Sequence, residues 1–477
     1  MTLSLCMIVR DEADEIGDCL RTVRDLADEI VVVDTGSTDA TAARAREQGA
    51  RVVAFPWNDD FAAARNRSIA EATGEWVLVL DADERLFPRH FEAVRRLIGN
   101  TRARALQIFV RHYTDDSTLM NWQPMDPAQA ESREFCGCFD SPRVRLFRRR
   151  PEIRFEGIVH ETVVPSLERH ALPTYRADVL IHHYKECRPA ERKRARNLLI
   201  FELSRRRTES ESRDADVWRQ RAMAALDVGE NADAVTALER AIELAPDRRD
   251  LHYQLGAVLI LIGQAERACV RHRRALERFP DEPELVQSLG DACLAAGRLG
   301  DAGEAYARSL ELDPYLYRAV VGLGAIAMQE GRTDAAIRYF EQAKSIHAGL
   351  DIPYVNTGLI YLSLGRLDDA LAELRRAFAA NPKRWQSLAA IGTILFETGQ
   401  YPESREWYLK AAAADGCAPE VFVKLSASCA ALGLRDEART WAEKAGAANP
   451  AYARIQPLIC APPAQRNSRD RSSGCAE

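Results

Sequence analysis

Hydrophobic and polar residues follow one pattern in the first part of the chain, up to about residue 184. Short apolar runs alternate there with amphipathic stretches. We expect strands at residues 3–9, 29–34, 51–55, 75–81 and 105–110, and early helices at 13–24 and 61–73. Runs that are apolar throughout, such as IVVVD and WVLVLD, are typical of parallel strands that are covered on both faces. The pattern predicts an α/β domain over residues 1–184.

A different period governs the chain beyond about residue 215. Glycines recur every 34 residues, and small residues and prolines recur in the same phase. The first glycine series is 256, 290, 324, 358 and 392, the second is 229, 263, 297, 331, 365, 399 and 433, and the small residues stand at 234, 268, 302, 336, 370, 404 and 438. Small residues let two antiparallel helices approach closely, and glycine ends the first of them. We therefore expect an all-α solenoid of about seven tetratricopeptide repeats over residues 215–452.

The segment between these parts, residues 185–214, is helical in pattern and rich in arginine and lysine. We interpret it as a basic helical linker with a solvated face. A nucleic-acid-binding patch is the sharper alternative, but no aromatic residues alternate with the charges to stack on bases. The tail, residues 453–477, carries Pro, Ser, Arg and Gly and is expected to be disordered.

Composition narrows the class of protein. Apolar residues make up 47% of the 477 residues, and 65 basic against 71 acidic residues give a net charge of -6. This balance favours neither nucleic acid nor an acidic membrane surface as a partner. The apolar run at the N-terminus is too short for a secretory signal, and no stretch is long enough for an integral membrane span. We expect a cytoplasmic protein.

The eleven cysteines are scattered without the spacing of a disulfide framework. We expect reduced, mostly buried thiols. The alternative is a zinc site made by Cys136, Cys138, Cys187 and His182, although a C-x-C pair without a second paired motif is weak support for it.

Two carboxylates follow the apolar run WVLVLDADE. Asp81 and Asp83 come just past the carboxyl edge of a strand, which is where ligands of open α/β sheets bind. Two carboxylates at this spacing can share one hard divalent cation and leave positions free for diphosphate oxygens. The alternative is a turn or a helix cap. The motif predicts a cation site at this edge.

A second carboxylate ends the strand in EIVVVDTGSTDAT. Asp34 is followed by a tight turn at Gly36–Thr38, where the backbone can approach a ligand closely. Asp34 is thus a candidate for contact with a base or ribose, whereas Asp39 is better explained as a turn and cap residue. Neither G-x-G-x-x-G after the first strand nor G-x-x-x-x-G-K-[ST] occurs, so hydride transfer and ATP hydrolysis are not indicated.

The runs CMIVRDEADEIGDCLRTVRDLADEIVVVDTGSTDAT and FAAARNRSIAEATGEWVLVLDADE resemble the inverting family-2 glycosyltransferases. The resemblance spans about residues 1–184. It implies the GT-A fold, with a Rossmann-like, mixed but mostly parallel sheet. The later runs VRLFRRRPEIRFEGIVHE and IHHY are similar to lipopolysaccharide-core glucosyltransferases and to bacterial members fused to tetratricopeptide repeats, one of which is an S-linked peptide glycosyltransferase.

The resemblance implies a role for each matching residue. Val9, Arg10 and Glu12 would line the nucleotide site, Asp34 would meet the base, and Arg65 would meet the nucleotide. A second group completes the donor site: Asp81 and Ala82 beside the ribose, Asp81 and Asp83 on a Mn²⁺ or Mg²⁺ ion, and His183 as a further metal ligand. One departure is Asp11, where the family usually has asparagine, which puts the detail of base recognition in doubt.

Inversion requires a general base that deprotonates the acceptor opposite the leaving diphosphate. Glu161 in GIVHE is the candidate, and His160 would orient it or contact the diphosphate. The alternative for this pair is an ordinary surface or strand-edge position. Arg143, Arg145 and Arg148 could neutralise phosphate, although solvated or salt-bridged roles are the simpler interpretation.

The sequence thus predicts transfer of a sugar from a nucleotide diphosphate sugar, expected to be a UDP-sugar, to a polypeptide or surface-glycan acceptor. The repeats would bind a protein or peptide acceptor on their concave face. Alternatively they would only stiffen the enzyme or form a homodimer. A rival hypothesis is a non-catalytic scaffold protein whose α/β domain is a relic.

Overall fold

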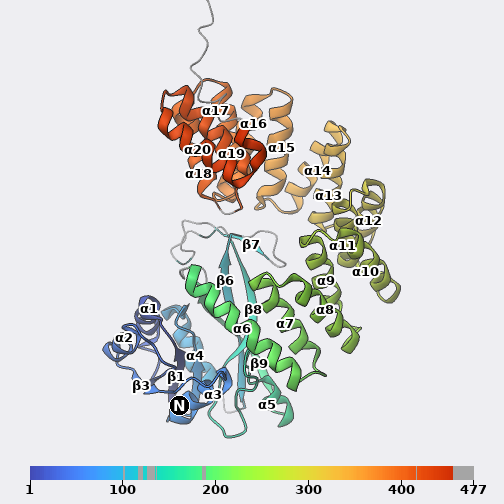
Figure 1. Ribbon diagram of the computed structural model, residues 1–477. Coiled ribbons are helices and arrows are strands. Elements are labelled where there is room, and N and C mark those ends of the chain that lie inside the picture. The colour runs from blue at the N-terminus through green and yellow to red at the C-terminus, as the bar shows by residue number, and fades with distance from the viewer. Residues whose placement is uncertain are drawn as a thin grey trace, which may run out of the picture. The chain divides into compact units, whose positions relative to one another are not determined.

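The computed structural model describes residues 1–99, 102–115, 122–125, 131, 135, 137–184, 190–414 and 416–454. The chain divides into two compact units, residues 1–322 and 323–477. The first unit contains the α/β part and the first helices of the repeats, and the described residues of the second form the later repeat helices (Figure 1). The predicted tail lies outside the described residues from 455 onward, and so do residues 185–189 of the predicted linker.

One mixed sheet forms the centre of the α/β part. Its order is β3-β2-β1-β4-β8-β6-β9-β5, and β7 pairs with β8. The strands are β1 (Leu3–Val9), β2 (Glu29–Asp34), β3 (Arg51–Ala54), β4 (Trp76–Val79), β5 (Glu84–Arg85), β6 (Ala105–Thr114), β7 (Gln123–Pro124), β8 (Gly137–Arg148) and β9 (Thr174–His183). The pairs β1–β2, β1–β4, β2–β3 and β6–β9 are parallel, whereas β8 runs antiparallel to β4 and β6.

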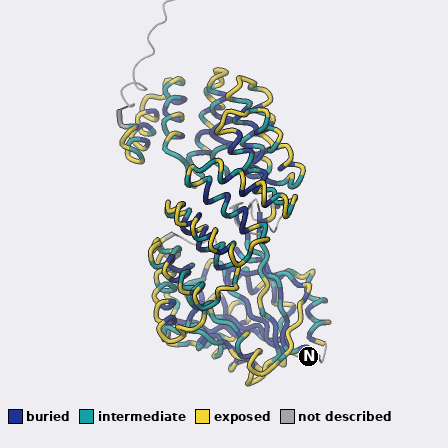
Figure 2. Tube along the Cα trace, turned by 90° about the vertical axis from the view of Figure 1, so that its right-hand side faces the viewer, coloured by how far each residue is buried: buried dark blue, intermediate teal, exposed yellow. Residues whose placement is uncertain are grey.

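Side-chain alternation sends each strand's residues to two separate cores. On β1, Leu5 and Met7 join the core formed with α1 (Ala13–Val23) and α4 (Phe91–Gly99), while Cys6 joins the core under α3 (Phe61–Glu71). Both faces of the first strands are therefore covered, and Figure 2 shows these strands in dark blue. The remaining elements of this part are α2 (Thr41–Glu47), the 3-10 turn η1 (Pro88–His90) and α5 (Val164–Arg169).

The predicted α/β class and the predicted mixed sheet are confirmed. The first four predicted strands and both early helices agree with the structure to within a few residues, because their apolar periods are determined locally. All pairs among β1 to β4 are parallel, whereas in the rest of the described sheet only the β6–β9 pair is parallel. The second half of the sheet is built around β8, whose charged, irregular sequence carries little strand signal.

Beyond the sheet, every described element is helical. Helix α6 (Ala190–Ser210) precedes the repeats. The repeat helices are α7 (Ala215–Val228), α8 (Asn231–Leu244), α9 (Arg249–Leu261), α10 (Ala265–Arg278), α11 (Pro283–Ala295), α12 (Leu299–Leu312), α13 (Tyr317–Gln329), α14 (Thr333–Ile346), α15 (Asp351–Ser363), α16 (Leu367–Ala380), α17 (Trp385–Glu397), α18 (Tyr401–Ala413), α19 (Pro419–Ala431) and α20 (Arg435–Ala448), followed by the 3-10 turn η4 (Pro450–Arg454). No helix within the described ranges is long and apolar enough to cross a membrane.

The two glycine series have different physical causes. The series that begins at Gly229 ends the first helix of each pair in the left-handed region, with φ +83° at Gly229 itself. The series that begins at Gly256 lies inside a helix, beneath a large side chain 16 residues further on, and an added Cβ would fall within about 3 Å of that side chain. The pairs are Gly256–His272, Gly290–Tyr306, Gly324–Phe340, Gly358–Leu374 and Gly392–Tyr408. The 34-residue period therefore arises because, in each pair of helices, a glycine of the first helix makes room for a large side chain of the second.

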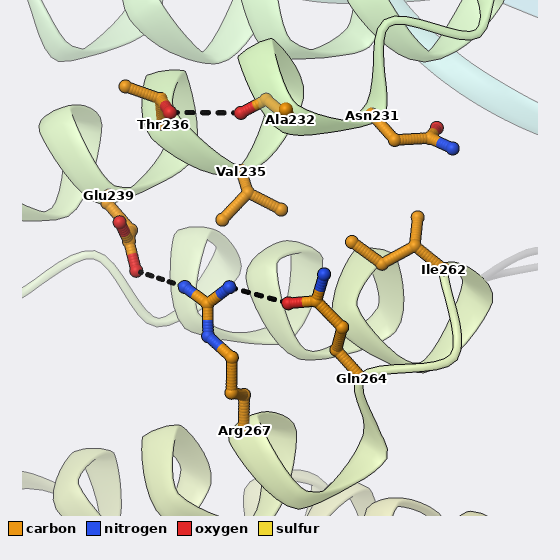
Figure 3. A pocket seen from close by; sticks show the side chains of 8 residues that line it. All are labelled: Asn231, Ala232, Val235, Thr236, Glu239, Ile262, Gln264 and Arg267. Carbon is orange, nitrogen blue, oxygen red and sulfur yellow. Dashed lines mark hydrogen bonds and ion pairs between the residues drawn. The ribbon is translucent and has the colours of Figure 1, made fainter.

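A pocket of about 460 Å³ lies between α8 and the start of α10 (Figure 3). Its one arginine, Arg267, donates hydrogen bonds to Gln264 and to Glu239. Because this cation is already paired, the pocket offers little to attract an anion. It shares no lining residue with the carboxylates that the sequence singled out.

His272 is the one residue with an imidazole side chain among the five large residues that cover the glycines of the series that begins at Gly256. It is 1% exposed, and neither ring nitrogen has a hydrogen-bond partner in the structure. Burial lowers the pKa of His272 to about 4. The equivalent positions hold Tyr306, Phe340, Leu374 and Tyr408, so the site accepts an apolar ring in place of the polar one. His272 therefore lowers the stability of its repeat.

Substituting His272→Phe should raise the stability of the array by about 1–3 kcal/mol at neutral pH, since it removes two buried unpaired nitrogens. It should also make the protein less acid-sensitive. The unfolded chain protonates this histidine near its ordinary pKa and the folded chain only near 4, so stability falls as pH drops between those values. Thermal unfolding from pH 7.5 to 5 measures both effects.

The exposed His170→Gln variant is the control for this experiment, and it should leave the midpoint and its pH slope unchanged. An equal or lower midpoint for His272→Phe at pH 7.5 would show that the unpaired nitrogens cost nothing.

Candidate active site

The ends of β1, β2 and β4 bring the predicted carboxylates to one edge of the sheet. Val9 pairs with Asp34 at the end of the parallel β1–β2 ladder, and Asp81 follows β4 on the other side of β1. Far along the chain, His183 pairs with Glu84 in the short β5–β9 ladder. This pairing brings a C-terminal strand of the domain beside the D-x-D motif, a placement that local sequence cannot reveal.

The loop after β2 is held by its own side chains. Asp34 accepts hydrogen bonds from the backbone N–H groups of Gly36 (3.1 Å) and Ser37 (2.8 Å). Asp11 adopts φ +53° and accepts from the Thr38 N–H at 2.7 Å, which ties this loop to the end of β1. Aspartate and asparagine tolerate this backbone region, so the departure at Asp11 is compatible with the geometry.

The other residues predicted to line the nucleotide site lie around this loop. Arg10 is exposed, Val9 is buried, and the Glu12 N–H donates to Thr41 Oγ1 at 2.7 Å. Asp39 accepts from the backbone N–H groups of Thr41 and Ala13, which agrees with the turn role expected for it, whereas the N-cap of α2 is Ala40.

A buried arginine joins two of the predicted site carboxylates. The Arg65 side chain, 6% exposed, donates Nη2 to Asp81 and Nε to Glu161, the latter at 3.0 Å. Arg145 donates to the second oxygen of Asp81 (3.0 Å) and to Glu84 (2.7 Å). Residues that are as many as 96 positions apart thus form one ion-pair network.

Charge balance within this network sets the protonation of its carboxyls. Desolvation raises the pKa of Asp81, but the charges of Arg65 and Arg145 outweigh it and hold that pKa well below its usual range. Burial raises the pKa of Glu84 despite the charge of Arg145. Two buried donors of the network, Arg65 Nη1 and Arg145 Nε, have no hydrogen-bond partner in the structure. Such unsatisfied cationic N–H groups suit an anionic ligand.

Asp83 and His183 form a second pair beside this network. Asp83 is 4% exposed, and its Oδ2 lies 3.6 Å from His183 Nε2. The other ring nitrogen of His183 lies 2.8 Å from His112 Nδ1, and His112 Nε2 lies 2.8 Å from Ser141 Oγ. Burial lowers the pKa of His183, but contact with the Asp83 carboxylate outweighs it and raises the pKa overall.

His160 precedes Glu161 with a left-handed backbone, φ +53°. Desolvation and the positive charges of Arg207, Arg219 and Arg143 lower the pKa of His160 to about 4. The imidazole is therefore neutral at pH 7. A neutral ring can donate or accept a hydrogen bond, but it cannot supply a positive charge to a diphosphate.

The remaining candidates have ordinary surroundings. Ala82 is buried, Arg143 is exposed, and Arg148 stacks over Trp76 and donates to the Ala103 carbonyl. His182 contacts Tyr113 and Arg89, whereas its neighbour His183 contacts Asp83. For the alternative zinc site, Cys136 and Cys187 lie outside the described residues, and Cys138 is a free, buried thiol.

Sequence reasoning missed Glu84 and His112. Glu84 belongs to the same DADE motif. It is 1% exposed because it lies in β5, which pairs with β9. His112 lies in β6 and reaches the site through the pairing of β6 with β9, where it stands opposite His183. No local signal distinguishes it from a surface histidine.

Comparison with protein families agrees with this arrangement. The model named "Glycosyl transferase family 2" matches residues 4–155. Tetratricopeptide repeat models match residues 215–258, 273–316, 317–347 and 355–419.

Three known proteins illustrate the similarity. A TPR repeat-containing protein of Synechococcus elongatus is 42% identical over 35% of this chain and 36% of its own length. The SPbeta prophage-derived glycosyltransferase SunS of Bacillus subtilis is 29% identical over 36% of each chain. The crystal structure of yeast Tom70 aligns with a TM-score of 0.46 and 16% identity over 58% of this chain and 65% of that chain.

The matched segment spans 36% of the length of each of these two curated relatives, so the similarity concerns parts of the proteins. Both parts of the prediction are nevertheless confirmed by separate matches in separate regions. The chain contains an N-terminal segment, residues 4–155, that matches the family 2 glycosyltransferases, and it is followed by tetratricopeptide repeats.

Proposed function

We propose that the N-terminal domain transfers a sugar, with inversion, from a nucleotide diphosphate sugar to an acceptor nucleophile. The observation that supports this most is that two groups lie at the carboxyl edge of the sheet: Asp81 and Glu161, held by Arg65 and Arg145, and the separate pair of Asp83 and His183. Such an edge is where α/β sheets bind nucleotides. A UDP-sugar is the expected donor.

Asp83 and His183 would hold a divalent cation, Mn²⁺ or Mg²⁺. Their facing ligand atoms are 3.6 Å apart, close to the separation of neighbouring ligands around one ion. No group of three or more His, Cys, Asp or Glu residues in the described part of the chain could hold a metal. The remaining positions would then come from diphosphate oxygens and water, as Mg²⁺ prefers. When bound, the cation offsets the charge that builds on the leaving diphosphate.

The residues around this pair have supporting roles. His112, bonded to the far nitrogen of His183, would fix the ring's orientation and tautomer. Asp81 was also a predicted metal ligand, but both of its oxygens accept hydrogen bonds from arginines, so we assign it to holding Arg65 and Arg145. The unpaired Nη1 of Arg65 and Nε of Arg145 would then favour the anionic donor.

Glu161 would act as the general base. Its Oε1 accepts from Arg65 Nε, and no described residue hydrogen-bonds to its Oε2. The side chain is 14% exposed, so the carboxylate is shielded but still reachable. Accepting the acceptor's proton at Oε2 would leave the Arg65 contact in place, which keeps the base oriented during transfer.

The acceptor in this proposal is a polypeptide or a surface glycan, and the repeats would bind it or a partner protein. Buried free thiols such as Cys6 and Cys19 suit a reducing compartment, so the proposal includes a cytoplasmic location. The alternative is a scaffold protein whose glycosyltransferase domain no longer turns over. The intact acceptor-side carboxylate Glu161, held by Arg65, favours the enzyme.

Removing the Asp83 carboxylate should weaken cation-dependent nucleotide binding. We expect UDP to bind the wild type in the presence of Mn²⁺, and Asp83→Ala to weaken it by about 10- to 100-fold, because one of two protein ligands is lost. Isothermal titration of the full chain measures this. Asp178→Ala, an exposed carboxylate on the same strand as His183, is the matched control. Absence of Mn²⁺-dependent UDP binding by the wild type would contradict the proposal.

Glu161→Gln tests the base separately from the donor site. The amide keeps the size of the side chain and can still accept from Arg65, but it cannot take a proton. We expect kcat to fall by about 10²- to 10⁴-fold while UDP binding stays within a few-fold of the wild type. Release of UDP from a panel of UDP-sugars reports turnover. Nucleotide binding without any turnover by the wild type would instead support the scaffold alternative.

A further inference from the structure

Arg207 connects the glycosyltransferase domain to the helices that follow it. It lies on α6, outside the segment that matches the family, and it is 8% exposed. Its Nη1 donates to the carbonyl of Val159 (2.8 Å) and to Gln220 Oε1 on α7 (3.0 Å). Its Nε and Nη2 contact Glu211. One guanidinium thus joins the loop before Glu161, the connecting helix and the first repeat.

The loop that Arg207 contacts has an unusual backbone. Gly157 and His160 both have positive φ, at +96° and +53°. An added Cβ at Gly157 would lie 2.9 Å from the Arg207 guanidinium, so the glycine allows this close approach. The carbonyl of Ile158, between them, accepts from the Phe61 N–H at the start of α3, which also carries Arg65. The bridge between Glu156 and Thr162 closes this loop at its base, and the contacts with Phe61 and Arg207 hold the residues between them.

The contacts continue beyond Arg207 into the repeats. Thr208, the next residue on α6, accepts from Arg221 of α7 at 3.0 Å, and Arg221 also donates to Asp233 of α8 at 2.8 Å. Arg206, on the other side, donates to Asp59 at 3.0 Å, next to the residue that caps α3. Helix α6 is therefore bonded to the first repeat, to the loop before Glu161 and to the turn before α3.

We infer that Arg207 is a positioning residue for Glu161, and that α6 with the first repeat is a required part of the enzyme. This inference rests on the proposed function. Arg207 fixes the carbonyl two residues before Glu161, and Arg65 fixes the Glu161 carboxylate itself. Together they hold the backbone before Glu161 and the carboxylate at the end of its side chain. Misplacement of a catalytic group by about 1 Å can cost about 10²-fold in rate, so the contact bears on turnover more than on donor binding.

Arg207→Met in the full chain tests the inference. The variant keeps much of the apolar stem and removes every hydrogen bond of the guanidinium. We expect kcat for UDP release to fall by about 10- to 100-fold, with KM for the UDP-sugar and the Kd for UDP with Mn²⁺ within about threefold of wild type. Hydrogen exchange should rise in residues 158–162 of the unliganded protein, because local opening becomes easier.

Arg205→Met is the matched control. Arg205 lies on the same helix, and its ion-pair partner among the described residues is Glu202, one turn away on the surface. It should leave kcat and exchange in 158–162 unchanged. Equal exchange and equal kcat in Arg207→Met and Arg205→Met would overturn the inference. A loss of UDP binding equal to the loss of kcat would also overturn it, since that result indicates a general structural role.

Two further variants keep the test decisive if Arg207→Met does not fold. Arg207→Lys retains the charge but cannot bridge Val159 and Gln220 in the same fork geometry, and it should give an intermediate kcat. Gly157→Ala crowds the guanidinium and also strains the backbone at φ +96°, so it should raise exchange in the same residues, and only a rise that Arg207→Lys shares is assigned to the Arg207 contact. Exchange is read without substrate, so it tests the Arg207 contact even if the wild type proves unable to turn over any UDP-sugar, which would count against the proposed function alone.

Discussion

A buried positive charge at Arg65 is the constraint on which the rest of the site depends. The guanidinium is 6% exposed and would be costly to bury without carboxylates on more than one side. Asp81, after β4, and Glu161, far downstream, supply them. Because the two partners come from different parts of the domain, the ion pairs bring the carboxyl edge of the sheet and the loop that carries Glu161 to one place.

Much of this fold follows from local sequence, and the reason is visible in particular elements. The runs ending at Asp34 and near Asp81 are apolar throughout, and parallel strands must end at a common edge, so the convergence of these carboxylates could be predicted. The 34-residue period is equally local. Each glycine of the Gly256 series meets a side chain 16 residues later, so helix, turn and partner lie within one repeat.

What could not be predicted depends on pairing between distant segments. Arg145 reaches Asp81 and Glu84 only because β8 runs antiparallel to β4, and the sequence of β8 left a solvated arginine as the simpler interpretation. His112 contacts His183 only through the β6–β9 register. The sequence of the basic helix α6 likewise predicts a linker with a solvated face. Its pattern does not reveal that one of its arginines, Arg207, is buried against a loop of the preceding domain.

The contacts of Arg207 indicate that the first repeat supports the loop before Glu161. A tether would need only flexible or solvated contacts, whereas Arg207, Thr208 and Arg221 join α6, α7 and the Val159 loop through buried or partly buried hydrogen bonds. In a repeat array each unit is stabilised by its neighbours, so the first repeat is held on one side by the α/β domain and on the other by the next repeat. If the first repeat became less stable, the loop that carries Glu161 would therefore lose its contacts before the sheet did.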